Sequence, residues 1–99
     1  MRPPRRGEPL VQRRLPIRNT LGLHARPAMA FASAAAGFAC TVQVRRTDSE
    51  ERVDGKSVMQ MLMLACTQDT EIEIVTDGAD EQAAMDALVK LVEARFEEE

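Results

Sequence analysis

Apolar and polar residues alternate along three stretches of the chain, at residues 10–18, 40–45 and 70–76. A period of two predicts β-strands that bury one face. Pro16 has no N–H to donate, which predicts that the first strand lies at a sheet edge. Residues 50–53 are charged almost throughout and predict a short return strand at the other edge. Within each stretch the apolar side chains predicted to share one face of the strand are Val11, Leu15 and Ile17, then Cys40, Val42 and Val44, and finally Ile72 and Ile74.

Two further stretches have the spacing of helices. Residues 25–36 place small apolar side chains on one stripe, and Gly37 is the expected terminator. Residues 57–65 predict a short helix that is apolar nearly all round. Ser57 and Gln60 at its start fit a capping box, in which each side chain bonds a free backbone N–H of the other.

A last helix is predicted from the turn at residues 77–81 to about residue 96, with the carboxylates of that turn favoured at its N-terminus. The order is therefore strand, helix, strand, strand, helix, strand, helix. Such a pattern predicts an α+β fold in which helices cover one side of an antiparallel sheet and the other side faces water. Because the first and third strands have edge character, the second and fourth are expected inside.

Composition limits the chain to one domain of 99 residues. Its two cysteines, Cys40 and Cys66, lack metal-ligand spacing, and we expect them to be buried thiols of a reduced, cytoplasmic protein. We interpret the Arg- and Pro-rich residues 1–9 as a disordered, solubilising extension ahead of a domain at residues 10–99. No aromatic residue there stacks on bases, so a nucleic-acid partner is not expected. The apolar stretch 28–40 is too short to span a bilayer, so neither export nor membrane insertion is expected.

His24, the only histidine of the chain, is predicted at the start of the helix over residues 25–36. The first N–H groups of a helix are unpaired and, with the helix dipole, favour an anion. Pro27 suits this first turn because it lacks an N–H, and Arg26 matches phosphate oxygens. A nucleophilic imidazole here indicates phosphoryl chemistry, with a surface or capping histidine as the alternative. No carboxylate partner, second ligand or nucleotide loop can be located, so we expect no metal, no cofactor and a phosphoryl group supplied by a partner.

Three motifs occur in order along the chain. They are Gly22-Leu23-His24-Ala25-Arg26-Pro27-Ala28, Gly55-Lys56-Ser57-Val58-Met59 and Gly78-Ala79-Asp80-Glu81-Gln82-Ala83. Together they resemble the HPr family, the histidine-containing phosphocarriers of the bacterial phosphoenolpyruvate-dependent sugar phosphotransferase system. The resemblance runs from about residue 10 to the C-terminus. It implies a βαββαβα open-faced β-sandwich with sheet order 1-4-2-3, in agreement with the edges assigned from the pattern.

The resemblance also implies a function. His24 would accept a phosphoryl group on Nδ1 from phosphorylated enzyme I and pass it to an EIIA protein or domain, with Arg26 stabilising the phosphate. Ser57 matches the serine that an HPr kinase/phosphorylase modifies in some family members, although a helix cap explains it equally well. Such a carrier is expected to be a monomer without independent turnover of a small substrate. The alternatives are a regulatory paralogue of the nitrogen-related branch and an interaction protein switched by phosphorylation.

Partners of the family dock on an apolar patch beside the histidine, and flexible methionines suit a surface with several partners. The resemblance and the excess of apolar residues at 57–65 predict that this patch includes Gly22, Leu23, Ala28, Met59, Met61 and Met63. Leu62 is expected in the core instead. Gln60, Ala65 and Asp69 stand where the family often has glycine, and Asp69 is expected to be left-handed.

Overall fold

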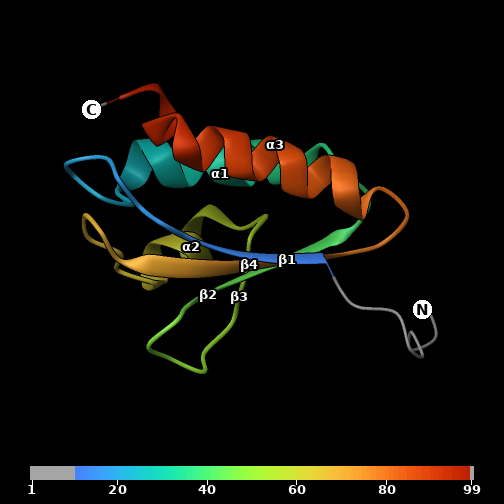
Figure 1. The fold of residues 1–99 in the computed structure, drawn as a ribbon, viewed down its shortest axis with the longest axis horizontal. Coiled ribbons are helices and arrows are strands. Elements are labelled where there is room, and N and C mark those ends of the chain that lie inside the picture. Colours follow the sequence, from blue (N-terminus) through green and yellow to red (C-terminus); the bar gives the residue numbers. More distant parts are fainter. Residues whose placement is uncertain (1–10, 99) are drawn as a thin grey trace.

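A four-stranded antiparallel sheet with helices over one face forms the body of the computed structural model, which describes residues 11–98 (Figure 1). The strand order β1-β4-β2-β3 confirms the predicted fold and the two predicted edge strands. The proposed extension over residues 1–9 and the domain boundary at residue 10 lie outside the described residues. The elements are β1 (Val11–Pro16), α1 (Ala25–Ala36), β2 (Thr41–Arg46), β3 (Val53–Asp54), α2 (Val58–Met63), β4 (Glu71–Asp77), α3 (Glu81–Glu93) and a 3-10 turn at Arg95–Glu97.

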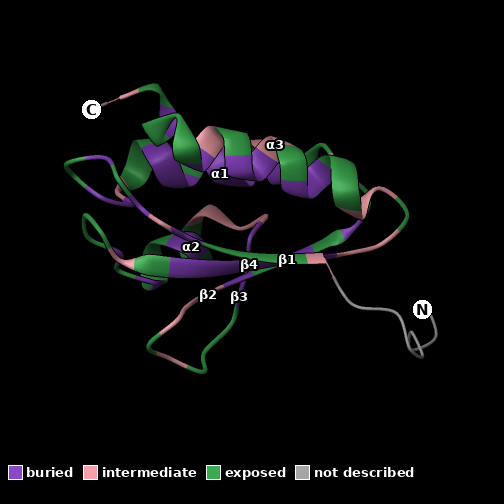
Figure 2. Ribbon diagram, viewed as in Figure 1, coloured by how far each residue is buried: buried purple, intermediate pink, exposed green. Residues whose placement is uncertain are grey.

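The core lies between the sheet and the helices, and the alternation in the strands explains why. Leu15 of β1 pairs with Ile72 of β4, while Val44 of β2 pairs with Ile74, and all four side chains are buried. Figure 2 shows the buried surfaces of α1 and α3 turned toward the sheet. No helix within residues 11–98 is long and apolar enough to cross a membrane. The largest fully buried side chains include Phe31, Ile17, Met61, Ile72, Ile74, Met85 and Leu88.

Three predicted boundaries are wrong by a few residues. The return strand predicted at 50–53 pairs with β2 only at Val53 and Asp54, because its charged residues have no apolar face to bury. The helix predicted at 57–65 is shorter, with Ser57 as its N-cap and Leu64 as its C-cap. Helix α3 ends at Glu93 rather than near residue 96, because the next turn leaves the right-handed conformation.

The open face of the sheet is less wet than predicted, because it carries a buried carboxylate. Glu73 on β4 is 5% exposed and accepts hydrogen bonds from Arg14 Nε at 3.1 Å and Arg45 Nε at 2.9 Å. Arg52 Nη1 lies 3.9 Å from the same carboxylate. Burial alone would raise the pKa of Glu73, but the two arginine hydrogen bonds outweigh it and lower that pKa.

Glu81 lies in the first turn of α3, where the sequence predicted carboxylates, but the Asp80 carboxylate has a different role. Asp80 is the N-cap residue but makes no side-chain bond to its own helix. Its carboxylate instead accepts from the backbone N–H of Ala39 at 2.7 Å and of Cys40 at 2.9 Å. The Asp80 side chain therefore ties the segment after α1 to the start of α3. Cys40 and Cys66 are free, buried thiols, as predicted.

Candidate functional site

His24 is the N-cap residue of α1, as the sequence predicted. Its backbone is extended, with φ −83° and ψ −168°, and its carbonyl accepts the first helical hydrogen bond from Ala28 N at 3.0 Å. The imidazole is 34% exposed and makes no capping hydrogen bond to the helix. The ring therefore stands beside the start of the helix, where unpaired N–H groups and the dipole favour an anion.

A tight loop holds His24 in this place. Gly22 N donates to Asn19 O at 3.0 Å, and Asn19 Nδ2 donates to Gly22 O at 2.6 Å. Gly22 has φ +67°, a conformation that favours glycine. Leu23, the residue before the histidine, is buried and donates its N–H to Cys66 O at 2.9 Å. These bonds fix the backbone that leads into the imidazole.

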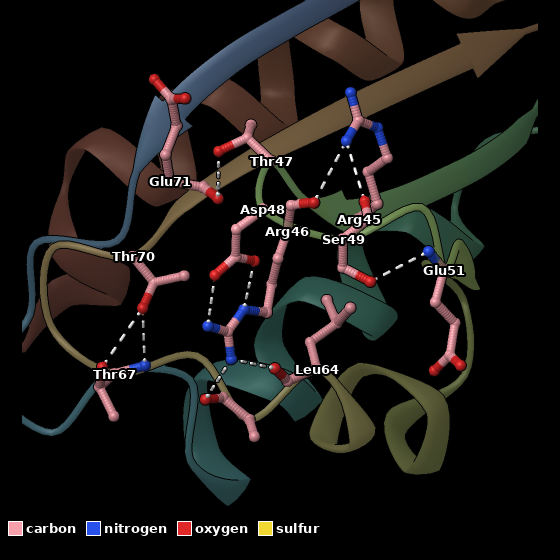
Figure 3. A network of polar contacts seen from close by, with 11 residues as sticks. Arg45, Arg46, Thr47, Asp48, Ser49, Glu51, Leu64, Thr67, Thr70 and Glu71 are labelled. Carbon is pink, nitrogen blue, oxygen red and sulfur yellow. Dashed lines mark hydrogen bonds and ion pairs between the residues drawn. The ribbon is translucent and has the colours of Figure 1, made fainter.

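The segment after α2, whose Cys66 carbonyl accepts the Leu23 N–H, is bonded in turn to Arg46 of β2. Arg46 Nη1 donates to Leu64 O at 3.3 Å and to Ala65 O at 3.4 Å, next to Cys66. The same guanidinium forms a two-point ion pair with Asp48, with distances of 3.0 and 2.9 Å (Figure 3). Ala65, where the family often has glycine, has φ +52°. Arg46 thereby satisfies carbonyl groups at the end of α2, as a cation at a helix C-terminus does.

Sequence reasoning missed two residues of the site, Asn19 in the loop before α1 and, with a larger effect on the imidazole, Glu98. Its Oε1 lies 2.9 Å from His24 Nε2 and accepts a hydrogen bond from Asn19 Nδ2, also at 2.9 Å. The hydrogen bond with His24 lowers the pKa of the Glu98 carboxyl; partial burial opposes this, while Asn19 and the charge of Arg26 add to it. The expectation that no carboxylate partner exists is therefore wrong. The acidic C-terminus offered a signal, but nothing local connects residues 74 positions apart.

Arg26 lies in the first turn of α1, exposed to solvent. Its positive charge helps to lower the pKa of the Glu98 carboxyl, as the hydrogen bond from His24 does. A shallow hollow of about 390 Å³ lies here, lined by Arg26, Pro27, Met29, Phe96 and Glu98 among others. Arg26 is thus placed to meet an anion bound at the helix start.

Five large apolar side chains are exposed on α1, on α2 and on the loop before α1. They are Leu21, Met29, Met59, Leu62 and Met63, with exposures of 72%, 57%, 76%, 38% and 67%. We call these five residues the apolar patch.

Within α2 the structure reverses two predictions. Met61 was expected at the surface but is fully buried, and Leu62 was expected in the core but is more than a third exposed. The stripe of Val58, Met61 and Leu64, at a spacing of three, packs against the core with Val58 partly and the other two fully buried, which turns Leu62 outward.

Three other residues predicted to contact partners are also buried. Gly22, Leu23 and Ala28 face the interior, because Gly22 packs against Cys66 and Thr67 while Leu23 and Ala28 join the hydrophobic core. Their effect on a partner is therefore indirect, through the position of the loop and of α1.

Ser57 caps α2, with its Oγ accepting from Gln60 N at 3.2 Å. Only this half of the predicted capping box forms, because the Gln60 side chain accepts from Asp54 N at 2.9 Å instead of from Ser57. Ser57 is partly exposed. Among residues 11–98 no group of three or more His, Cys, Asp and Glu side chains is placed to hold a metal ion.

The family model of the HPr component phosphorylation site of the phosphotransferase system matches residues 11–94. The chain belongs to the HPr family. HPr of Neisseria meningitidis serogroup A is 45% identical over 89 residues, covering 90% of this chain and 98% of the relative. The phosphocarrier protein NPr of Proteus mirabilis is 41% identical and covers 88% and 96%. The crystal structure of HPr from Thermoanaerobacter tengcongensis superposes with a TM-score of 0.84 at 35% identity, covering 90% of this chain and 98% of that one.

In this HPr chain the structure joins Asn19 and Glu98 to the His24 site through hydrogen bonds, and Arg26 lies in the helix turn that follows His24. Ser57 lies at the start of α2, outside the hydrogen bonds that surround His24. The protein is accordingly a phosphocarrier of the phosphotransferase system, and its C-terminal segment reaches His24 through Glu98.

Proposed function

We propose that this HPr protein accepts a phosphoryl group on Nδ1 of His24 from phosphorylated enzyme I and donates it to an EIIA protein or domain of a sugar system. The observation that carries the proposal is the imidazole at the N-terminus of α1, one-third exposed and with Nε2 already engaged by Glu98. The nitrogen left to react is Nδ1. An exposed helix end lets two large partners reach the same atom in turn.

The chemistry follows from this placement. The Nδ1 lone pair attacks phosphorus, the bond between phosphorus and enzyme I breaks, and its electron pair leaves with enzyme I. Negative charge on the phosphoryl oxygens faces the first turn of α1, where unpaired N–H groups favour it. Arg26 in the same turn supplies a fork of donors. Transfer to EIIA is the same displacement in the opposite sense.

The apolar patch is the proposed docking surface for both partners. Its members lie on the loop before α1, on α1 and on α2, two helices that pack against each other, and three of them are methionines. Flexible thioether side chains adapt to different surfaces at little cost in strain. One patch can therefore serve a donor and an acceptor that do not resemble each other.

Phosphoryl transfer to His24 can be measured directly. The protein is incubated with enzyme I and labelled phosphoenolpyruvate, and then with EIIA proteins of the sugar and nitrogen types. We expect acid-labile label on the native chain, none on His24→Ala, and movement of the label to the sugar EIIA. Because His24 is the only histidine, phosphorus NMR assigns the phosphorylated nitrogen without ambiguity. Label on His24→Ala equal to that on the native chain, or label on Nε2, would refute the mechanism.

A nitrogen-type carrier is the second candidate, favoured by the 41% identity to an NPr protein. Its chemistry at His24 would be the same and its acceptor different. The second arm of the same experiment separates the two, because a nitrogen carrier passes its label preferentially to the nitrogen EIIA.

Regulation at Ser57 is proposed separately. A phosphate there would sit at the start of α2, where helix N–H groups tolerate negative charge. Incubation with an HPr kinase and ATP should label the native chain but not Ser57→Ala. Ser33→Ala, at an exposed serine in α1, is the matched control and should label normally. Absence of label on the native chain would end this proposal.

We further propose that the carrier acts as a cytoplasmic monomer, the form in which the patch is open to both partners. Light scattering of the purified chain tests this, since an HPr of Thermoanaerobacter tengcongensis has been crystallised as a dimer. A dimer at micromolar concentration would contradict it.

A further inference from the structure

The Glu98 carboxylate determines which ring nitrogen of His24 carries a proton. Glu98 Oε1 lies 2.9 Å from Nε2, and its lowered pKa keeps the carboxyl ionised at neutral pH. An ionised carboxylate only accepts hydrogen bonds, so Nε2 must be the donor. In the neutral imidazole the proton is then on Nε2, and Nδ1 keeps its lone pair.

Asn19 fixes the carboxylate in this orientation. The side chain of Asn19 is fully buried, and its Nδ2 group donates to both Gly22 O and Glu98 Oε1. Reversing the amide would set its oxygen against two acceptors, so the orientation is determined. Its Oδ1 has no hydrogen-bond partner among residues 11–98. A buried amide with one unpaired atom is retained here because its nitrogen joins the His24 loop to the C-terminal segment.

The C-terminal segment reaches His24 through an unusual backbone. Arg95, Phe96 and Glu97 have φ values of 56°, 54° and 61°, three consecutive left-handed residues and none of them glycine. L-residues adopt this conformation at an energetic cost, and it persists where surrounding contacts hold it. The contacts here are the burial of Phe96 against the core and the hydrogen bonds of Glu98. In Figure 1 the red C-terminal turn lies at the same end of the molecule as the blue loop that precedes α1.

We propose that Glu98 is a positioning residue that keeps a proton on Nε2 of His24 throughout phosphoryl transfer, an inference that rests on the proposed function. When Nδ1 attacks phosphorus, the ring gains one unit of positive charge and the Nε2 proton becomes more acidic. The Glu98 carboxylate, which accepts the hydrogen bond from Nε2, keeps that proton on the ring. When EIIA takes the phosphoryl group, the N–P electron pair returns to Nδ1 and the leaving group is neutral imidazole rather than imidazolate. No proton has to enter or leave the site in either direction.

The carboxylate does not obstruct the reaction, because Nε2 and Nδ1 lie on different sides of the ring. The charged groups that act here are Glu98, which contacts Nε2 from the C-terminal turn, and Arg26 in the first turn of α1, whose charge acts on the Glu98 carboxylate. Arg26 stabilises the incoming phosphoryl group, while Glu98 stabilises the imidazolium that carries it.

Nitrogen NMR of the full-length, ¹⁵N-labelled chain tests the proposal, because a single histidine gives one pair of ring signals. The variants are Glu98→Ala, which removes the acceptor, Glu98→Gln, which keeps a neutral acceptor, and Glu97→Ala, an exposed neighbour in the same turn as the matched control. In the native chain and in Glu97→Ala we expect Nε2 protonated and its proton protected from water. In Glu98→Ala the exchange of that proton should rise about tenfold, with Glu98→Gln between.

Transfer rates complete the test. Transfer from the phosphorylated protein to EIIA should fall about tenfold in Glu98→Ala and remain native in Glu97→Ala. An Nε2 proton that exchanges equally in the native chain and Glu98→Ala would overturn the proposal, as would unchanged transfer in Glu98→Ala. Failure of the native chain to accept label from enzyme I, with its Nε2 proton still protected, would instead refute the proposed function and with it the transfer role of Glu98.

Discussion

Replacing Gly22 by alanine should destabilise the loop that carries His24. Gly22 has φ +67°, and a Cβ at this position would overlap the carbonyl oxygen of Cys66 and lie 2.8 Å from Thr67 Cα. Both contacts are backbone atoms, so no flexible side chain can move aside. The left-handed conformation costs an alanine about 1–2 kcal/mol, and overpacking adds about 1–3 kcal/mol.

The two effects together predict a loss of about 2–5 kcal/mol in the free energy of unfolding, a large part of the roughly 5–15 kcal/mol typical of a domain. Urea unfolding followed by circular dichroism, with linear extrapolation to water, measures this loss. The matched control is Gly37→Ala at the end of α1. Gly37 has φ −73°, and the nearest atom to its added Cβ is Ala34 O at 3.4 Å. That variant should be neutral or about 0.4–1 kcal/mol more stable.

The Gly22→Ala variant should lose phosphoryl-transfer activity as well as stability. A Cβ at this position pushes the loop away from Cys66 and lengthens the 2.9 Å bond from Leu23 N to Cys66 O. Phosphoryl transfer at His24 should therefore fall even where the variant is still folded. A loss of stability under about 1 kcal/mol, or an equal loss in Gly37→Ala, would refute the assignment of Gly22 as the residue that sets this loop.

Other substitutions and conditions test separate parts of the structure. Met61→Ala should lose about 2–5 kcal/mol of stability because its side chain is fully buried; Met59→Ala should keep its stability and raise the KM for EIIA, and the reverse result would invalidate the assignment of the patch. Burial raises the pKa of the Cys66 thiol to about 11, so a disulfide reagent in mildly alkaline buffer should modify it only after unfolding. Glu73→Gln should cost about 1–2 kcal/mol at neutral pH. The pKa of Glu73 is lowered in the folded state, so its ionised carboxylate stabilises the fold above the usual pKa range of a carboxyl group. This stabilisation is lost as the pH falls through the lowered pKa. Urea unfolding should therefore show the free energies of unfolding of the native chain and of Glu73→Gln converging in acid.

Local sequence patterns were sufficient to predict the helices, the strands and most of the sheet topology. Alternation at Ile72 and Ile74 predicted the central strand, and Pro16 predicted an edge. The first signal depends on the pleat of a single strand and the second on the N–H that proline lacks, and both can be recognised from residues close along the chain. The place of His24 at the start of α1 was equally predictable, because Pro27 and the helical stripe after it mark a helix N-terminus.

Short elements and turns were less predictable. Helix α2 has six residues, all apolar except Gln60, so its sequence does not say which side faces the core. Packing against the rest of the core buried Met61 and exposed Leu62. Asp80 bonds across to residues 39 and 40 rather than to its own helix, which no local capping rule anticipates.

The sequence by itself determined the sheet, the covering helices and a histidine at a helix start, because each depends on residues close along the chain. Only the tertiary structure decided what surrounds that histidine. Asn19 and Glu98 meet His24 because α3 packs across the sheet and a left-handed turn returns the chain to the site. Sequence periodicity carries no information about such a contact, since its geometry is set by how whole elements pack and not by the spacing of residues within them.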